Sequence, residues 1–440
     1  MNILIENAGI VFTQNDKREV LRDTSIYISG GIIKEIGKSS LLKEKYTPDL
    51  VLDASKMAVL PGLVNLHTHS VQVLLRGRFD EPLMNWLRLV DLEYEKLDDV
   101  HVRAAARLTF IEGLLCGTTT FLDMEGNVEP IVSAAREVGI RLYEAIALVD
   151  TAETGVSGFT QVADPEEEVK KALKVAREKM ATGQLNFLLG PVGFPSSSPE
   201  LLRIASEEAR KNGLKLHAHL SESMVNEELS RKMFGLSETG MLEKIGFLGP
   251  DVIVAHGVNL DPIDIQVLAK HGVNVAHCPT SNAKLGNGIA PALKMINQGL
   301  NVGLGTDGAA SNDSLDLFSE MKTFILMQRS REGFDRRVNA QLALDMATRN
   351  GGLALDSSGK LGVISPGAYA DLVLVDLTLP SMLPSENVLD NLVFSGGCRA
   401  VRHVIVNGEL LVYDGRLRNE ELYSRALEEF NEAAKRVSYK

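Results

Sequence analysis

The chain has 440 residues, of which 45% are hydrophobic and 24% are charged, and its formal net charge is −12 at pH 7. This mixture is typical of a globular protein of one or two domains, and the acidic balance argues against a nucleic-acid backbone as a partner. The N-terminus lacks the basic start and apolar run of a signal peptide, and no apolar run approaches the roughly 20 residues of a membrane helix.

Three cysteines, Cys116, Cys278 and Cys398, form neither a Cys-x-x-Cys pair nor an even framework. Such cysteine usage suits a reducing compartment, so we expect a cytoplasmic protein with no membrane partner. The sequence leaves the oligomeric state open, a homo-oligomer included.

Short strands rich in isoleucine and valine are predicted near both ends of the chain, in residues 3–12, 25–37, 49–55, 370–377 and 400–417. The last of these stretches contains Asn407-Gly408 and Asp414-Gly415, which are dipeptides typical of hairpin turns. Residues 419–437 have helical periodicity and begin with acidic side chains. We interpret the two ends, residues 1–56 and 366–440, as parts of one small composite β-sandwich domain.

The middle of the chain, residues 57–365, alternates buried-looking strands with amphipathic helices. Helical spacing is clear in residues 165–182 and 198–213. The strand segments are residues 63–69, 118–124, 140–150, 185–194, 214–223, 252–260, 273–282 and 302–308. Strands that alternate with helices pair in parallel, and eight of them predict a (β/α)₈ barrel of the TIM type. The expected fold class is α/β, with the chemistry at the C-terminal ends of the strands.

Polar side chains stand where these strands are expected to end. His67 and His69 end the first strand and, two residues apart, point to the same face. Later strands end in His217 and His219 with Glu222 shortly after, in His256, in His277 and in Asp307. Two neighbouring histidines, a further histidine and an aspartate form a donor set for a divalent metal, typically zinc, and a water can fill a remaining position.

Five motifs together resemble the amidohydrolase superfamily, and within it the cytosine-deaminase-like branch: PGLVNLHTH, HAHLSES, VAHGVNL, HCPTSN and GTDGAASNDSLDLF. That branch contains methylthioadenosine/S-adenosylhomocysteine deaminases, guanine deaminases and triazine chlorohydrolases. The resemblance covers essentially the whole chain. It implies a metal-dependent hydrolase that releases ammonia from an amino-substituted nitrogen heterocycle, such as a purine or an adenosine derivative.

Carried over by position, the resemblance implies that His67, His69, His219 and Asp307 are the metal ligands. His217 is not a family ligand, and either a role in supporting the ligands or a structural role is expected for it. Dinuclear members supply a carboxylated lysine at the end of strand four, but the stretch LLGPVGF contains none here. This departure favours a single divalent ion. The ion expected from the donor set is Zn²⁺, with Fe²⁺ or Mn²⁺ as alternatives.

Three residues are expected to be catalytic. Asp307 can take a proton from a water that the metal makes more acidic, and can return it to the departing amine. Glu222 is placed to protonate a ring nitrogen, and His256 to hold the attacking oxygen or the developing charge.

The expected substrate contacts are Trp86, Glu95, Ser311 and His277. Trp86 resembles an aromatic residue that packs on the ligand in adenosine-derivative deaminases, although a core position fits it equally well. Glu95 stands where a ribose-binding glutamate is found in those enzymes, with Tyr94 and Glu93 as alternatives. Ser311 fits the serine that follows the aspartate of strand eight.

Two positions depart from the deaminase pattern. Val192 follows Gly190-Pro191, where many of these deaminases have a histidine that contacts the substrate, and no further arginine follows Arg141 in its strand. An apolar surface on this side argues against methylthioadenosine or S-adenosylhomocysteine as the preferred substrate. The alternatives to deamination are hydrolysis of another leaving group, such as chloride from a triazine, and a non-catalytic relative that binds metal for structure. The presence of Glu222 and His256 argues against the latter.

Overall fold

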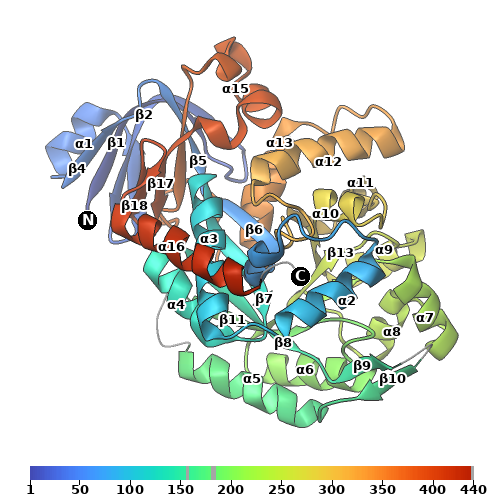
Figure 1. The fold of residues 1–440 in the computed structure, drawn as a ribbon. Coiled ribbons are helices and arrows are strands. Elements are labelled where there is room, and N and C mark those ends of the chain that lie inside the picture. Colours follow the sequence, from blue (N-terminus) through green and yellow to red (C-terminus); the bar gives the residue numbers. More distant parts are fainter. Residues whose placement is uncertain (155–157, 180–184, 438–440) are drawn as a thin grey trace.

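A computed structural model describes residues 1–154, 158–179 and 185–437. At its centre a parallel sheet in the order β15-β14-β13-β12-β11-β8-β7-β6 curls into a nearly closed barrel (Figure 1). Its strands are β6 (Leu63–Thr68), β7 (Thr118–Glu125), β8 (Arg141–Leu148), β11 (Leu185–Pro191), β12 (Lys215–Leu220), β13 (Val252–His256), β14 (Asn274–His277) and β15 (Asn301–Leu304). Each of these strands falls in one of the predicted segments, so the α/β barrel is confirmed.

The barrel closes between its first and last strands, just beyond the end of β15. The backbone N–H of Asp307 donates to the carbonyl oxygen of His67 over 2.9 Å. The side chain of Asn65 accepts from the backbone N–H of Thr306 at 3.0 Å and donates to the Thr306 hydroxyl at 2.7 Å. Residue 305 must be small, because a Cβ on Gly305 would lie 2.8 Å from the Cβ of His67. Two strand ends that carry predicted ligands are therefore held side by side.

Successive side chains of each barrel strand point alternately into the lumen and outward, toward the surrounding helices. Ile253 and Ala255 of β13, the strand beside β12, belong to an apolar cluster that takes alternate residues from several of the barrel strands. Leu216 and Ala218 of β12 belong instead to the larger cluster that packs with the helices. Because side chains alternate along a strand, the histidines of β12 face the lumen.

Helices cover the outside of the barrel (Figure 1). They are α2 (Leu83–Tyr94), α3 (Asp99–Leu115), α4 (Val128–Val138), α5 (Pro165–Lys179), α6 (Pro199–Lys211), α7 (Met224–Phe234), α8 (Glu238–Lys244), α9 (Pro262–His271), α10 (Pro279–Lys284), α11 (Ala292–Asn297), α12 (Leu317–Glu332), α13 (Ala340–Asp345) and α14 (Gly351–Leu355). The two predicted amphipathic helices are α5 and α6, and residues 180–182 of the first lie outside the described residues. Ser198 caps α6 through a hydrogen bond from the backbone N–H of Leu201, and Pro199 fits its first turn.

Shorter elements fill the connections. They are α1 (Ser39–Lys45), α15 (Val388–Asn391), η1 (Ser70–Leu75), η3 (Met346–Asn350), η4 (Pro380–Met382), η5 (Ser385–Asn387), η6 (Leu392–Gly396), η7 (Gly397–Ala400) and the hairpin of β9 (Thr151–Thr154) and β10 (Gly158–Gln161). Among the residues that the structure describes, none of the helices has the length and apolar character needed to cross a membrane.

The two ends of the chain share a second sheet, beside the barrel in Figure 1. Its strands are β1 (Ile3–Phe12), β2 (Val20–Ser29), β3 (Ile32–Gly37), β4 (Leu50–Asp53), β5 (Met57–Pro61), β16 (Leu372–Asp376), β17 (Val401–Val406), β18 (Glu409–Tyr413) and β19 (Arg416–Leu417). The N-terminal and C-terminal halves meet where β5 pairs antiparallel with β16. We call this the composite sheet.

The first barrel strand begins later than residue 57, where we expected the barrel to start. Residues 57–61 form β5, which pairs with β1 and β16 in the composite sheet, and the barrel starts with β6 at Leu63. Only Gly62 separates the two strands. Both strands are buried and apolar, so the hydrophobic pattern could not show which sheet each one joins.

The predicted hairpin turns of the C-terminal half are present. Asn407 and Gly408 connect β17 to β18 with φ angles of 50° and 75°, and Asp414 and Gly415 connect β18 to β19 with 49° and 74°. Positive φ at both central residues is what a tight turn of this hand requires. The predicted final helix is α16 (Glu420–Arg436), which packs along α3 (Figure 1).

A disulfide bond joins the composite sheet to the barrel helices. Cys116, which follows α3, is bonded to Cys398 in η7, while Cys278 is free and buried. The expectation that the cysteines form no framework is wrong for this pair. The two positions are 282 residues apart in sequence, so their spacing gave no sign of the bond.

We expect Cys398→Ser to destabilise the protein by about 2–4 kcal/mol, because the bond constrains a very long loop of the unfolded chain. Thermal unfolding followed by calorimetry should show the loss. Cys116→Ser should have the same effect, and the double variant should be no less stable than either single one. Unreduced wild-type protein that exposes three reactive thiols in urea would contradict the bond.

Candidate metal centre and active site

Three imidazoles from opposite strands of the barrel meet at its C-terminal mouth. His67 lies in β6, His69 directly follows it, and His219 lies in β12. The Nε2 atoms of His69 and His219 are 3.3 Å apart. Nδ1 of His69 faces the carbonyl oxygen of Met124 at 2.8 Å, and Nδ1 of His219 faces that of Val192 at 2.6 Å. A carbonyl oxygen only accepts, so each Nδ1 carries the hydrogen and each neutral ring presents a bare Nε2.

Asp307 brings a carboxylate to the same point. Its Oδ1 lies 3.5 Å from Nε2 of His67 and 3.8 Å from Nε2 of His69. The Ser281 hydroxyl donates to Oδ2 at 2.5 Å, and the backbone N–H of Gly308 donates to Oδ1 at 2.7 Å. The φ angle of Asp307 is 61°, a left-handed conformation that is uncommon outside glycine and that clusters at functional sites.

These donor atoms fit a divalent metal ion. Ligand atoms of His67, His69 and Asp307 lie within 4.8 Å of one another, as do those of His67, His219 and His256. Nε2 of His67 is buried and has no hydrogen-bond partner among the described residues. Bare imidazole nitrogens this close repel one another unless a cation lies between them, and histidine nitrogens with a carboxylate are preferred zinc ligands. The exact ligand set stays a prediction.

The electrostatics of the site suit metal binding, which requires neutral imidazoles. Burial lowers the pKa of His67 to about 4 and also lowers the pKa of His69. It lowers the pKa values of His217 and His219 well below the usual range. Asp307 accepts hydrogen bonds from the Ser281 hydroxyl and from the backbone N–H of Gly308, and both favour its ionised form. The mouth thus combines neutral nitrogens with one anionic oxygen.

Glu222 stands beside these donor atoms, on the loop that follows β12. Its Oε2 is 3.8 Å from Nε2 of His256, and its Oε1 accepts from Nδ2 of Asn287 at 3.1 Å. Burial raises the pKa of Glu222, although His256 and Asn287 act against the shift. A carboxyl group with a raised pKa in such a site can hold a proton and deliver it.

His256 ends β13 in a left-handed conformation, with a φ angle of 74°. Its Nδ1 donates to the side-chain oxygen of Asn282 at 2.9 Å. The ring is almost fully buried. This hydrogen bond leaves Nε2 facing both Glu222 and the donor atoms of the metal site.

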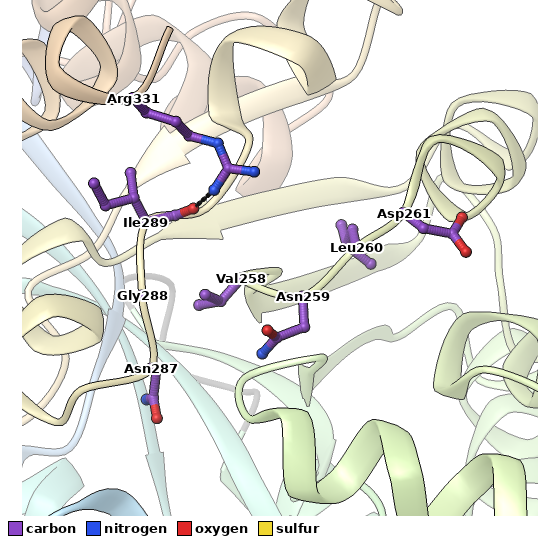
Figure 2. Close-up of a pocket in the computed structure, with 8 residues that line it drawn as sticks. All are labelled: Val258, Asn259, Leu260, Asp261, Asn287, Gly288, Ile289 and Arg331. Carbon is purple, nitrogen blue, oxygen red and sulfur yellow. Dashed lines mark hydrogen bonds between the residues drawn. The ribbon is translucent and has the colours of Figure 1, made fainter.

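A pocket of about 270 Å³ is lined by two residues that hydrogen-bond to Glu222, Asn259 and Asn287 (Figure 2). The side-chain amide of Asn259 donates to the backbone carbonyl oxygen of Glu222, and the side-chain amide of Asn287 donates to the carboxylate of Glu222. Arg331 lies beside Ile289 and donates to its carbonyl oxygen (Figure 2). The pocket is lined by Val258, Asn259, Leu260, Asp261, Asn287, Gly288, Ile289 and Arg331.

The structure shows which groups surround each of the expected substrate contacts. Trp86 in α2 is 3% exposed and belongs to the main core cluster, and its Nε1 has no hydrogen-bond partner among the described residues. Glu95 caps the end of α2 and is exposed. The Ser311 hydroxyl donates to the carbonyl oxygen of Gly308.

His277 ends β14, and its ring packs edge-on against Phe324 of α12, with centroids 5.9 Å apart. Burial lowers its pKa to about 3. The alternatives to Glu95 are engaged elsewhere: Tyr94 donates its hydroxyl to Glu125, and Glu93 pairs with Arg78 and Lys96. Contacts of all these residues with a substrate stay predictions.

Sequence reasoning missed four residues of the site. Ser281 and Asn282 stand in the motif HCPTSN, which was used for the family resemblance but not residue by residue. Asn259 likewise stands in the motif VAHGVNL, whereas Asn287 lies on the loop after α10, 65 residues from Glu222, and had no signal of its own. Ordinary loop asparagines have no sequence feature that distinguishes them from turn residues.

Comparison with known proteins gives consistent results. The model of the amidohydrolase family matches residues 58–411. A 5-methylthioadenosine/S-adenosylhomocysteine deaminase from Thermococcus onnurineus is 37% identical over 95% of both chains, and a 5'-deoxyadenosine deaminase from Methanosarcina mazei is 36% identical over 94% of both. Among solved structures, a zinc complex of atrazine chlorohydrolase from Arthrobacter aurescens has a TM-score of 0.90 at 26% identity, covering 97% of this chain and 100% of the other. An adenosine deaminase from Xanthomonas campestris with bound zinc also has a TM-score of 0.90 at 26% identity, covering 98% of both chains.

Elemental analysis of protein purified without chelators should find about one divalent ion per chain, because a set of three histidines and one aspartate completes one site. His219→Ala should remove most of this metal. His271→Ala, at a half-exposed histidine that pairs with Glu243, should retain it. Two tightly bound ions per chain, or an unchanged metal content in His219→Ala, would contradict the predicted ligand set.

Proposed function

Because the chain belongs to the amidohydrolase family, we propose that it is a metal-dependent hydrolase that releases ammonia from an amino-substituted nitrogen heterocycle. The observation that carries the proposal is the position of Glu222. This carboxyl group, with a raised pKa, lies beside a set of metal-binding donor atoms without being among them. Hydrolytic deamination needs a proton donor at that place, because the ring nitrogen must be protonated while the neighbouring carbon is attacked.

The proposed metal ligands are His67, His69, His219 and Asp307. A divalent ion held by them, with zinc supported by the zinc-bound structural relatives, supplies Lewis acidity that makes a water molecule a nucleophile near neutral pH. The chain's own part is to hold the imidazoles neutral, which their burial does, and to hold the carboxylate ionised, which the hydrogen bonds from Ser281 and Gly308 favour.

The proposed proton transfers use three side chains. Glu222 protonates a ring nitrogen of the substrate, and Asn287 fixes the orientation of its carboxyl group. His256, held by Asn282, presents Nε2 to the attacking oxygen or to the charge that develops on it. Asp307 accepts a proton from the water and passes it to the departing amine, with Ser281 holding its Oδ2. The second proton of the water returns to the Glu222 carboxylate as the amine leaves, so the reaction exchanges a C–N bond for a C–O bond, restores Glu222 and releases ammonia.

We expect Glu222→Gln to lower kcat by at least about 10²-fold, because an amide of the same size cannot transfer a proton at neutral pH. Metal content and substrate binding should be close to those of the wild type. Ammonia release from a panel of aminopurines, adenosine derivatives, cytosines, pterins and aminotriazines provides the assay, and chloride release from chlorotriazines tests the other leaving group.

Glu207→Gln, on the exposed face of α6, is the matched control and should leave kcat unchanged. Near-normal turnover by Glu222→Gln would refute the proton-transfer role. Loss of metal from that variant would show instead that Glu222 is a ligand.

An adenosine derivative is the proposed class of substrate, supported by the names of the two deaminase relatives. The two sides of the mouth differ in polarity. Val192 packs against the apolar cluster of the lumen, whereas Asn259 and Asn287 line the pocket beside Glu222. We therefore place the polar substituent of the ring in this pocket and expect methylthioadenosine to be a weaker substrate than another aminated ring.

Val192→His should raise kcat/KM on methylthioadenosine by between about two- and tenfold, since one hydrogen bond to the substrate contributes about 0.5–1.5 kcal/mol. Val192→Leu keeps the side chain apolar and should give no gain. A wild-type protein that prefers methylthioadenosine to every other ring in the panel would show that this departure is compensated elsewhere.

The composite sheet is proposed to fold over as a small β-sandwich. In support, Ile5 and Ile28 from the N-terminal strands share one buried cluster with Leu372, Leu374 and Ile405 from the C-terminal strands. Residues 1–61 and about 366–440 would then form this domain, around a catalytic barrel that begins at Leu63.

A further inference from the structure

His67 differs from the other two imidazoles of the metal site in what holds its Nδ1 atom. Nδ1 of His69 and Nδ1 of His219 each face a backbone carbonyl oxygen. Nδ1 of His67 instead faces Nε2 of His217 at 2.8 Å. A carbonyl only accepts a hydrogen bond, but an imidazole nitrogen can donate or accept, so this contact alone does not decide which nitrogen of His67 carries the hydrogen.

The hydrogen bond at Nδ1 of His217 decides which nitrogen of His67 carries the hydrogen. Nδ1 of His217 lies 3.0 Å from the carbonyl oxygen of Ile253, the residue that pairs with it in register on β13. This nitrogen must therefore carry a hydrogen. His217 has no exposed surface, and a neutral ring has only one N–H, so its Nε2 is bare and accepts from Nδ1 of His67.

The position of this hydrogen determines whether Nε2 of His67 can bind a metal ion. With its hydrogen on Nδ1, His67 keeps a lone pair on Nε2. That atom is buried without a hydrogen-bond partner among the described residues and lies 3.5 Å from Oδ1 of Asp307. The opposite arrangement, with His217 donating to His67, would put the hydrogen of His67 on Nε2 and would prevent that nitrogen from binding a metal.

We propose that His217 is a positioning residue, which fixes the tautomer and ring orientation of the ligand His67. Its Nδ1 donates to the Ile253 carbonyl oxygen, and its Nε2 can then only accept the hydrogen bond from Nδ1 of His67. The link runs across the lumen, because β12 and β6 are separated by β11, β8 and β7 in the sheet. His217 contacts neither metal nor substrate in this role. The inference rests on the proposed ligand set, since it assigns how one of those ligands is prepared.

Two variants separate the hydrogen bond from the volume of the ring. His217→Phe keeps a ring of similar size but offers Nδ1 of His67 no acceptor, whereas His217→Gln offers its amide oxygen near the position of Nε2. Zinc affinity of the metal-depleted proteins, measured by competition with a coloured chelator, should fall by about 10- to 100-fold in His217→Phe. His217→Gln should recover a substantial part of this loss.

The controls address folding and specificity. His403→Phe replaces another buried histidine, in β17, and should leave the zinc affinity unchanged. Thermal unfolding of the metal-depleted proteins shows whether each variant folds. Nitrogen-15 spectra of the histidine-labelled wild type test the arrangement without any variant, and both His67 and His217 should carry their hydrogen on Nδ1.

Equal zinc affinity in the wild type and a folded His217→Phe would overturn the inference alone, as would a hydrogen on Nε2 of His217. A wild-type protein with no zinc affinity would overturn the ligand set and the inference together. Lower affinity in His217→Phe with recovery in His217→Gln would support both.

Discussion

One backbone hydrogen bond, from the N–H of Asp307 to the carbonyl oxygen of His67, closes the barrel at the level of the site. It joins the first barrel strand to the chain that leaves the last one, so residues 240 positions apart become neighbours. Gly305 allows the two strand ends to lie this close, and the hydrogen bond from the backbone N–H of Thr306 to the side chain of Asn65 joins them a second time. The distance between the Asp307 carboxylate and the imidazoles is therefore set by backbone contacts between the ends of the barrel strands.

Strand pairing also sets the chemistry of the histidines. The carbonyl that orients His69 belongs to Met124 of β7, the strand beside β6. The carbonyls that orient His219 and His217 belong to Val192, just after β11, and to Ile253 of β13, on either side of β12. The register of the sheet thus directs bare nitrogens into the mouth, and burial keeps them uncharged.

The barrel and its chemical groups could be predicted from the sequence because both follow local rules. Strands and helices alternate in hydrophobic period, and His67, His69, His219, His256 and Asp307 stand where strands end. The structure brings these five side chains and Glu222 to one mouth.

What escaped prediction depends on contacts between distant parts of the chain. The Cys116–Cys398 bond and the Asn287–Glu222 hydrogen bond join residues whose spacing carries no information. The assignment of residues 57–61 to the composite sheet depends on β16, more than three hundred residues later. Trp86 shows a different limit, because a large apolar side chain suits a core and a ligand site equally well, and only packing decides between them.

The composite sheet has a consequence for how the protein is made. During synthesis β5 leaves the ribosome early, whereas its partner β16 is among the last strands to appear. Until then one edge of β5 has no strand to pair with, and unpaired edges of apolar strands attract other chains. The composite sheet can therefore be completed only after the whole barrel has been translated.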